Sequence, residues 1–280
     1  IENTVKRSRD TCWSEMAGGH LYKARADGAG DPVRLSRQPG IFVTPAWAPD
    51  GQRIVAVRGF ARAFESSSSP RATGVANELV WLPAEGGDAT LIMPMEDRSS
   101  PHFVESGERI FLFKSPDELV SVRWDGTNEQ TRVKVRGEKS PGSEQRQSPE
   151  AVAMAPTGDL AMASILGQIY TLTVPMVGGD APTVNVADSS DASFPVRKLT
   201  RFGGEFPAWG RRGRAVHWSL GNAHFVYDLD AAAAMIEQRR LPAGVLPGEE
   251  SPQPDGTGAL PAGAEAEETG GPESMELPDE

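Results

Sequence analysis

A repeat of about 50 residues runs through most of this chain, and a fixed repeat restricts the possible folds more than any single motif does. One repeated element consists of a short extended run, a turn glycine and an alternating apolar strand. Its four copies read PAWAPDGQRIVAV (45–57), PHFVESGERIFLF (101–113), VAMAPTGDLAMA (152–163) and PAWGRRGRAVHWS (207–219). The turn glycines Gly51, Gly107, Gly158 and Gly213 are 56, 51 and 55 residues apart. This spacing predicts one structural unit per copy.

A second element alternates with the first and joins an apolar strand to an acidic or glycine turn. Its copies read LYKARADG (21–28), LVWLPAEGG (79–87), LVSVRWDG (119–126) and, more loosely, IYTLTVPMVGG (169–179). A fifth copy, FVYDLD (225–230), lacks the glycine. The pair Asp50-Gly51 in the first element is typical of a tight hairpin, because glycine adopts the positive φ of such a turn without steric cost.

Together the two elements predict about four short strands per repeat, which is typical of a propeller blade. A single blade cannot bury both faces of its sheet, so neighbouring blades must stack on it. Along the strand after Gly51, Ile54, Ala56 and Arg58 should face one neighbour, whereas Val55 and Val57 should face the other.

The predicted fold is therefore an all-β propeller of four-stranded blades. About four to five blades lie in residues 19–230, and the ring is incomplete or imperfectly closed. An ordinary β-sandwich is the alternative, but it does not explain why two distinct elements alternate in the same order at least four times.

The ends of the chain differ from the repeats. Residues 1–18 are expected to belong to a partial blade, and residues 231–241 to a short helix, because DAAAAMIEQRR has helical composition and Pro242 would end it. Residues 242–280 are rich in Pro, Gly, Glu and Ala, a composition that predicts a disordered acidic linker or tail. The polar stretches 59–76 and 137–148 read as long loops.

The charge is concentrated at one end. The net charge is −11, and the ten acidic residues of 241–280, where Lys and Arg do not occur, leave −1 for the first 240 residues. A chain without a basic field is not expected to bind nucleic acid. No apolar run reaches the roughly 20 residues that a transmembrane helix needs.

The copy PAWAPDG with its following strand IVAV resembles the repeat of TolB-type propellers, which are WD40-like. LYKARADG and LVWLPAEGG resemble the strand-and-turn element of the same family. The resemblance covers roughly residues 19–230, and the third copy departs from it because Val152 stands at the proline position. It implies a periplasmic or secreted protein, although no signal peptide is visible in this chain.

The stretch 199–230, LTRFGGEFPAWGRRGRAVHWSLGNAHFVYDLD, is similar to the last propeller segment of bacterial proteins that join a TolB-like propeller to a C-terminal amidohydrolase domain. That resemblance implies a metal-dependent hydrolase domain, with a divalent metal such as zinc, that this chain does not contain. The chain is then a fragment whose partner is the hydrolase domain. A stand-alone periplasmic TolB-like scaffold that binds another protein is the alternative.

The sequence itself predicts no catalytic or cofactor-binding residue. Amidohydrolases begin their metal site with two histidines separated by one residue, but the four histidines, His20, His102, His217 and His224, show no such spacing. An HExxH motif, a phosphate-binding GxxxxGK[ST] loop and a GxSxG nucleophile elbow are all absent.

His217 and His224 are candidate ligands for a metal of the zinc type, although no metal site is predicted. With a loop centred between Leu220 and Gly221, the two histidines would be cross-strand neighbours and could share a metal. With a turn at Gly221-Asn222, His217 would pair with Val226 instead. Packing between blades is the other expected role for both rings.

Three further groups of residues have structural expectations. The tryptophans of the repeats are expected in the core between blades: Trp47, Trp81, Trp124, Trp209 and Trp218. Asp50, Glu105 and Asp125 are expected to accept backbone N–H groups at turns. Calcium binding is the alternative for them, but the sequence has no dense carboxylate loop of the kind that calcium sites use. Arg211, Arg212 and Arg214 form the densest basic cluster, which is expected to be a solvated turn or a contact for an acidic partner.

Overall fold

A computed structural model describes residues 18–59, 77–139, 146–175, 180–187 and 194–240. The chain divides into two units, residues 1–235 and 236–280, and only 236–240 of the second unit belong to the described residues. The predictions for residues 1–17 and 242–280, for most of the long loop 59–76 and for half of the loop 137–148 concern residues outside the described part.

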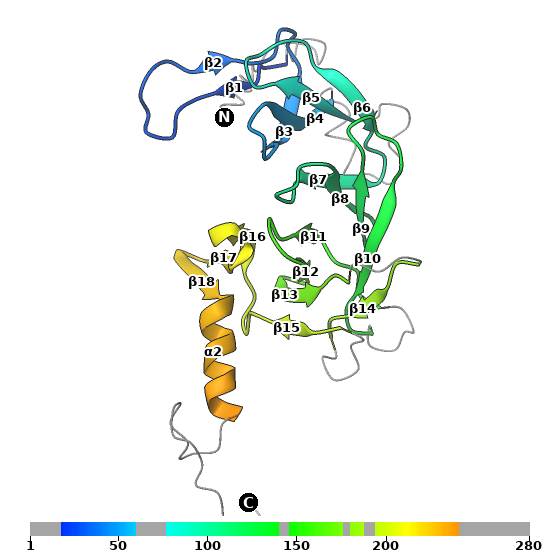
Figure 1. Ribbon diagram of the computed structural model, residues 1–280, viewed down its shortest axis with the longest axis vertical. Helices are drawn as coiled ribbons and strands as arrows, with labels where there is room; N and C mark the ends of the chain where they lie inside the picture. The colour runs from blue at the N-terminus through cyan, green and yellow to red at the C-terminus, as the bar shows by residue number, and fades with distance from the viewer. Residues whose placement is uncertain (1–17, 60–76, 140–145, 176–179, 188–193, 241–280) are drawn as a thin grey trace, which may run out of the picture. The chain divides into compact units, whose positions relative to one another are not determined.

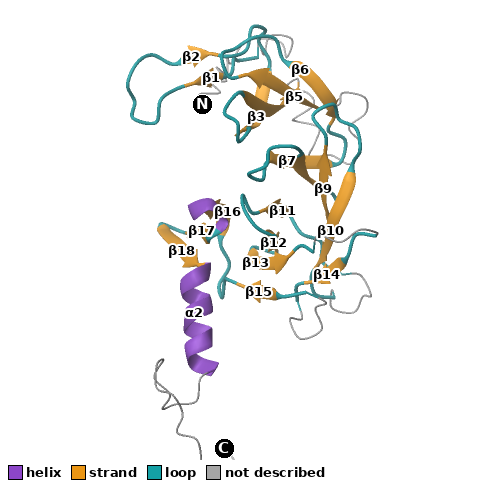
Figure 2. Ribbon diagram, viewed as in Figure 1, coloured by secondary structure: helices purple, strands orange, loops and turns teal. Residues whose placement is uncertain are grey.

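The first unit is built from antiparallel sheets in chain order, as the repeats predict (Figures 1 and 2). We number the blades from the N-terminus. Blade 1 is β1 (Tyr22–Lys23) and β2 (Val33–Arg34). Blade 2 is β3 (Ile41–Trp47), β4 (Arg53–Gly59), β5 (Glu78–Pro83) and β6 (Thr90–Pro94). Blade 3 is β7 (Arg98–His102), β8 (Ile110–Lys114), β9 (Glu118–Val122) and β10 (Gln130–Arg136). Blade 4 is β11 (Ala151–Met154), β12 (Leu160–Ile165), β13 (Gln168–Thr173) and β15 (Val196–Lys198). Blade 5 is β16 (Glu205–Gly210), β17 (Ala215–Leu220) and β18 (Ala223–Asp228).

The described residues therefore form an all-β propeller of four-stranded blades, with fewer strands in blades 1 and 5. In blades 2 to 5, the first repeated element supplies the first two strands and the second element supplies the third strand. One strand departs from this pattern. β14 (Thr183–Asn185) follows blade 4 in the chain but pairs in parallel with β10 of blade 3, so it links two neighbouring blades.

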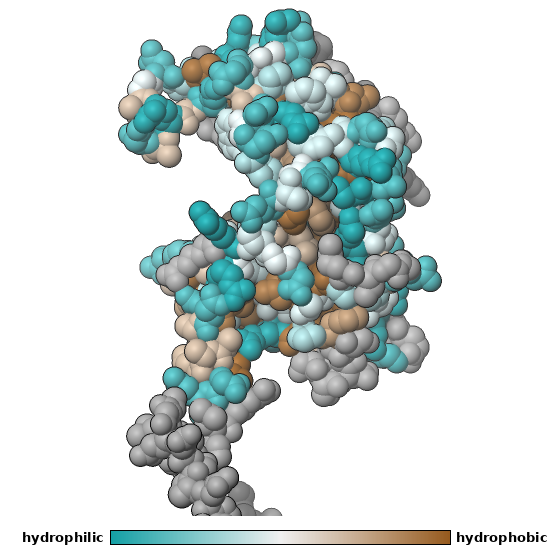
Figure 3. All heavy atoms as spheres, in the orientation of Figure 1, coloured by the Kyte–Doolittle hydropathy of each residue, from teal (hydrophilic) through white to brown (hydrophobic). Residues whose placement is uncertain are grey.

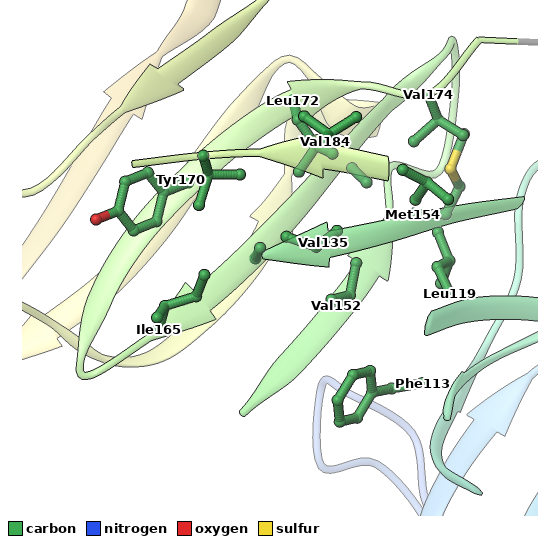
Figure 4. Close-up of a cluster of buried hydrophobic side chains, with 14 of the residues drawn as sticks. Phe113, Leu119, Val135, Val152, Met154, Ile165, Tyr170, Leu172, Val174 and Val184 are labelled. Carbon is green, nitrogen blue, oxygen red and sulfur yellow. The ribbon is translucent and has the colours of Figure 1, made fainter. Parts of the chain in front are cut away.

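Apolar side chains fill the space between successive blades. A cluster between blades 3 and 4 includes Phe113 and Leu119 from one sheet and Val152 and Leu172 from the other (Figure 4). On the face shown in Figure 3, hydrophilic residues dominate the visible described surface.

The strand β4 confirms the predicted alternation. Ile54 and Ala56 pack in the cluster shared with blade 1, whereas Val55 and Val57 pack in the cluster shared with blade 3. A strand with both faces buried is expected when sheets stack on either side of it.

Three of the four first strands contain the same irregularity. A register shift occurs in β3, β7 and β16, and at each one a residue that directly precedes proline has a positive φ: 46° at Thr44, 54° at Ser100 and 53° at Phe206. In β11, where Val152 replaces the proline, the register with β12 is continuous and no positive φ is found. The bulge thus accompanies the proline, which cannot donate to a ladder.

Helix α2 (Leu229–Arg240) follows β18 directly. The carboxylate of Asp228 accepts the backbone N–H groups of Asp230 and Ala231, as expected of a residue that caps the start of a helix. In the described part of the chain, α2 is too short and too polar to be a membrane-spanning helix.

Candidate functional site

The hairpin of blade 5 decides between the two registers considered for the histidines. Leu220 pairs with Ala223, so Gly221 and Asn222 form a two-residue turn, with φ of 59° at Gly221. His217 therefore lies opposite Val226, and His224 lies opposite Ser219. The two histidines are diagonal neighbours on one face of the sheet rather than a directly opposed pair.

The two imidazole rings nevertheless meet. Nδ1 of His217 lies 3.2 Å from Nε2 of His224, the ring centroids are 5.2 Å apart, and the ring planes differ by 16°. A nitrogen separation so much shorter than the centroid separation places the rings edge to edge in nearly one plane. One nitrogen donates a proton and the other accepts it, and the tautomers decide which does so.

A glycine makes room for the first of these rings. Gly210 lies on β16, and a Cβ atom added there would overlap with Nε2 and Cδ2 of His217. Because only glycine lacks that atom, Gly210 lets the imidazole ring of His217 lie directly over the backbone of β16. The repeat pattern alone does not single out Gly210. The only signal was its position directly after the repeat's tryptophan, where the first copy has Ala48.

The other two histidines have structural partners. Nδ1 of His20 lies 3.0 Å from the carbonyl oxygen of Ser36 and 3.1 Å from its hydroxyl. Nδ1 of His102 donates to the carbonyl of Ser100 at 2.8 Å, which leaves Nε2 to accept the backbone N–H of Met154 at 2.8 Å. His102 thus joins blade 3 to blade 4 as a neutral imidazole. Burial lowers its pKa, and the bond to Ser100 opposes that shift only in part.

Four tryptophans lie where the repeats predict. Trp218 is buried between blades 4 and 5, and three partly buried tryptophans pack against the clusters between blades: Trp81, Trp124 and Trp209. The indole N–H of Trp209 also donates to the carbonyl of Ala153, on the first strand of blade 4, at 3.1 Å.

Trp47 does not lie in the core between blades, and that expectation was wrong. The residue is 51% exposed and lines a cavity of about 860 Å³ together with Tyr22, Lys23 and Leu35. Trp47 occupies the repeat position of Trp209, which packs on the first strand of the preceding blade. In the described residues blade 1 contributes only β1 and β2, so Trp47 has no such strand to cover it.

The predicted turn carboxylates behave differently from one another. Asp50 accepts the backbone N–H of Gln52 and Asp125 accepts that of Thr127, and these bonds contribute to lowering the pKa of both carboxyl groups. For Asp125 the hydroxyl of Thr127 is the largest cause. Glu105 instead uses its own backbone N–H, which donates to the carbonyl of Pro156 in blade 4.

Two arginines of the basic cluster already make contacts within the molecule. Arg214 pairs with Asp230 in the first turn of α2, and the backbone carbonyl of Arg212 accepts the hydroxyl of Thr157. Among the described residues, no group of three or more His, Cys, Asp or Glu side chains converges on one point that could hold a metal ion.

Comparison with known proteins gives further support for the propeller fold. No family model and no curated protein matches the sequence. Among solved structures, an oligogalacturonate lyase in complex with manganese aligns with 76% of this chain at 12% identity and a TM-score of 0.50. TolB from Acinetobacter baumannii aligns with 75% at 16% identity and a TM-score of 0.40, and the Dos1 propeller with 70% at 10% identity and a TM-score of 0.39.

This chain covers 58%, 57% and 44% of the length of those three structures. At such low identities, the likeness to the lyase supports a shared fold and carries nothing about activity. The described part of the chain is a β-propeller module.

Proposed function

We propose that this chain is the propeller module of a TolB-like and amidohydrolase fusion protein, and that it is not catalytic by itself. Its role is to support a metal-dependent hydrolase domain outside this chain and to shape access to that domain's active site. A divalent metal such as zinc would belong to that domain, and the hydrolysed bond would be a C–N or related bond. The protein would work in the periplasm or outside the cell.

The way the chain leaves blade 5 is the observation that best supports this proposal. The stretch 199–230, which carries the resemblance to amidohydrolase-linked propellers, forms β16, β17 and β18 and then continues directly into α2. In blades 2 to 4 a fourth strand completes the sheet, whereas here a capped helix follows the third strand. A capped helix directly after the third strand suits a chain that continues into a further domain.

The surroundings of the histidines also favour a supporting role. His20 and His102 already make structural contacts. That leaves His217 and His224, whereas a catalytic zinc site uses three protein ligands and an open position for water. The propeller's own side chains therefore supply too few neighbouring imidazoles for the family's metal chemistry.

A protein-interaction scaffold is the second candidate, and the cavity beside blade 1 favours it. Tyr22 and Trp47 are 41% and 51% exposed there, and half-exposed aromatic side chains are common anchors in protein interfaces. In this reading the propeller acts alone and binds a partner protein through that cavity.

The natural gene and the natural protein separate the two candidates. We expect the reading frame to continue past Glu280 into a strand with a His-x-His pair. The longer protein should hydrolyse amide or ester substrates with added zinc, whereas residues 1–280 alone should be inert with or without zinc. A stop codon directly after Glu280 would favour the scaffold, and metal-dependent turnover by residues 1–280 would contradict the proposal.

A further inference from the structure

The histidine pair lies on the face of blade 5 that does not pack on blade 4. Val216 and Trp218 point into the cluster shared with blade 4. Because side chains alternate along a strand, His217 and Ser219 point to the opposite face, where His224 and Val226 are exposed. Among the described residues, no sheet covers this face, and there His224 is exposed and His217 is partly exposed.

The separation of the two nitrogens suits a shared metal ion. Two imidazoles bound to one tetrahedral ion, with metal–nitrogen bonds of about 2.0–2.1 Å, hold their nitrogens roughly 3.3 Å apart. Nδ1 of His217 and Nε2 of His224 are already 3.2 Å apart. An ion therefore requires a rotation of the two rings that turns both lone pairs toward it, while the separation of the nitrogens stays nearly the same.

Ion binding requires the proton between the two rings to move. In the free pair, one of the facing nitrogens carries a proton and the other offers a lone pair. When an ion binds, the ring that donated moves its proton to its far nitrogen through solvent, so both rings stay neutral. Both facing lone pairs are then free to bind the ion.

Neighbouring residues hold the pair in place. The two-residue turn at Gly221-Asn222 fixes the register that makes the histidines diagonal neighbours. Gly210 leaves room for the far edge of the His217 ring, which keeps Nδ1 directed at His224. Glu205 lies opposite Ser219 on the same face, so a carboxylate adds negative charge near the two imidazoles.

We propose that His217 and His224 form a binding site for a late first-row divalent ion, of the Zn²⁺, Ni²⁺ or Cu²⁺ class, bound through Nδ1 and Nε2 respectively. Water fills the remaining positions. Imidazole nitrogen suits these ions, whereas Mn²⁺ binds it more weakly. The proposal does not depend on the proposed function, because two protein ligands bind an ion without forming the family's hydrolase centre.

Calorimetric titration of residues 1–280 with Cu²⁺, Ni²⁺, Zn²⁺ and Mn²⁺ tests the site. We expect one ion per chain to bind most tightly as Cu²⁺ and most weakly as Mn²⁺. His217→Gln and His224→Gln should each reduce the affinity more than about tenfold, since even the loss of a group behind a ligand costs that much. His20→Gln is the matched control and should bind as the parent does. Equal affinity in the parent and both site variants, or Mn²⁺ bound as tightly as Cu²⁺, would overturn the proposal.

A second measurement separates ligand loss from misfolding. Gly210→Ala keeps both imidazoles but displaces the ring of His217, so it should weaken Zn²⁺ binding by about tenfold. In ¹⁵N spectra of the histidine rings, Zn²⁺ should shift Nδ1 of His217 and Nε2 of His224 in the folded parent protein. Shifts confined to other nitrogens, or unchanged binding by a folded Gly210→Ala variant, would contradict the assigned site.

Discussion

His102 shows how one side chain can tie two blades together. Its ring donates to the carbonyl of Ser100 in its own strand and accepts the backbone N–H of Met154 in the next blade. Both nitrogens are used, and only the neutral form with a proton on Nδ1 satisfies both partners. A proton added to Nε2 would break the contact with blade 4.

This contact makes stability depend on pH. The unfolded chain takes up a proton on His102 near its ordinary pKa of 6.5, whereas the folded protein, whose pKa is lowered by burial, does so only at lower pH. The contribution of His102 to the free energy of unfolding is therefore complete above about pH 6.5 and is lost as the pH falls through the folded pKa.

Urea unfolding of the parent and of His102→Phe at pH 7.5 and 5.5 measures this effect. At pH 7.5 the variant should be less stable by about 1–3 kcal/mol, because the N–H of Met154 loses its acceptor. At pH 5.5 the difference between the two proteins should shrink. A difference that stays constant or grows at the lower pH would contradict the neutral role of His102.

At the scale of single strands, the register shift in the first strands of blades 2, 3 and 5 has an energetic cost. Thr44, Ser100 and Phe206 each have a positive φ, which costs a residue with a Cβ atom about 1–2 kcal/mol. The branched Thr44 is the least suited of the three to that conformation. Its strand keeps the conformation because the bulge accommodates Pro45.

Replacing Thr44 by glycine should therefore stabilise the protein, by about 1 kcal/mol after the entropy of the unfolded chain is counted. Ala151 occupies the same repeat position in blade 4 without a positive φ, so Ala151→Gly should destabilise by roughly 0.5–1 kcal/mol. Denaturant midpoints of the two variants give the comparison. The same sign for both substitutions would contradict the strained strand.

The strands also show how far the sequence could predict this molecule. The turn glycines and the alternation of Ile54 with Val55 depend on local backbone rules, so the blades could be predicted from the repeats. β14 could not be predicted, because its parallel pairing with β10 depends on how a long connection crosses to another blade. The contact between His217 and His224 depends on ring rotamers and on the space at Gly210, and the repeat pattern predicts neither.

At the scale of the whole molecule, the propeller is a series of sheets that each need a neighbour. A residue at this repeat position can pack on the preceding blade only where that blade supplies a strand. The same residue type therefore stabilises the fold more in one blade than in another. Trp209 packs on blade 4 and donates to its first strand, whereas Trp47, at the equivalent position, is half exposed beside a cavity. Stability in such a series is mainly a sum of interfaces between neighbours.

The free energies of unfolding of Trp209→Ala and Trp47→Ala, measured by urea titration, test this central claim most directly. Trp209→Ala should destabilise by about 2–3 kcal/mol, below the cost for a fully buried tryptophan because the side chain is partly exposed. Trp47→Ala should cost less than about 1 kcal/mol, because little of its contact surface is buried. Equal losses in the two variants, or a larger loss for Trp47→Ala, would contradict an account in which stacked blades hold this protein together through equivalent positions.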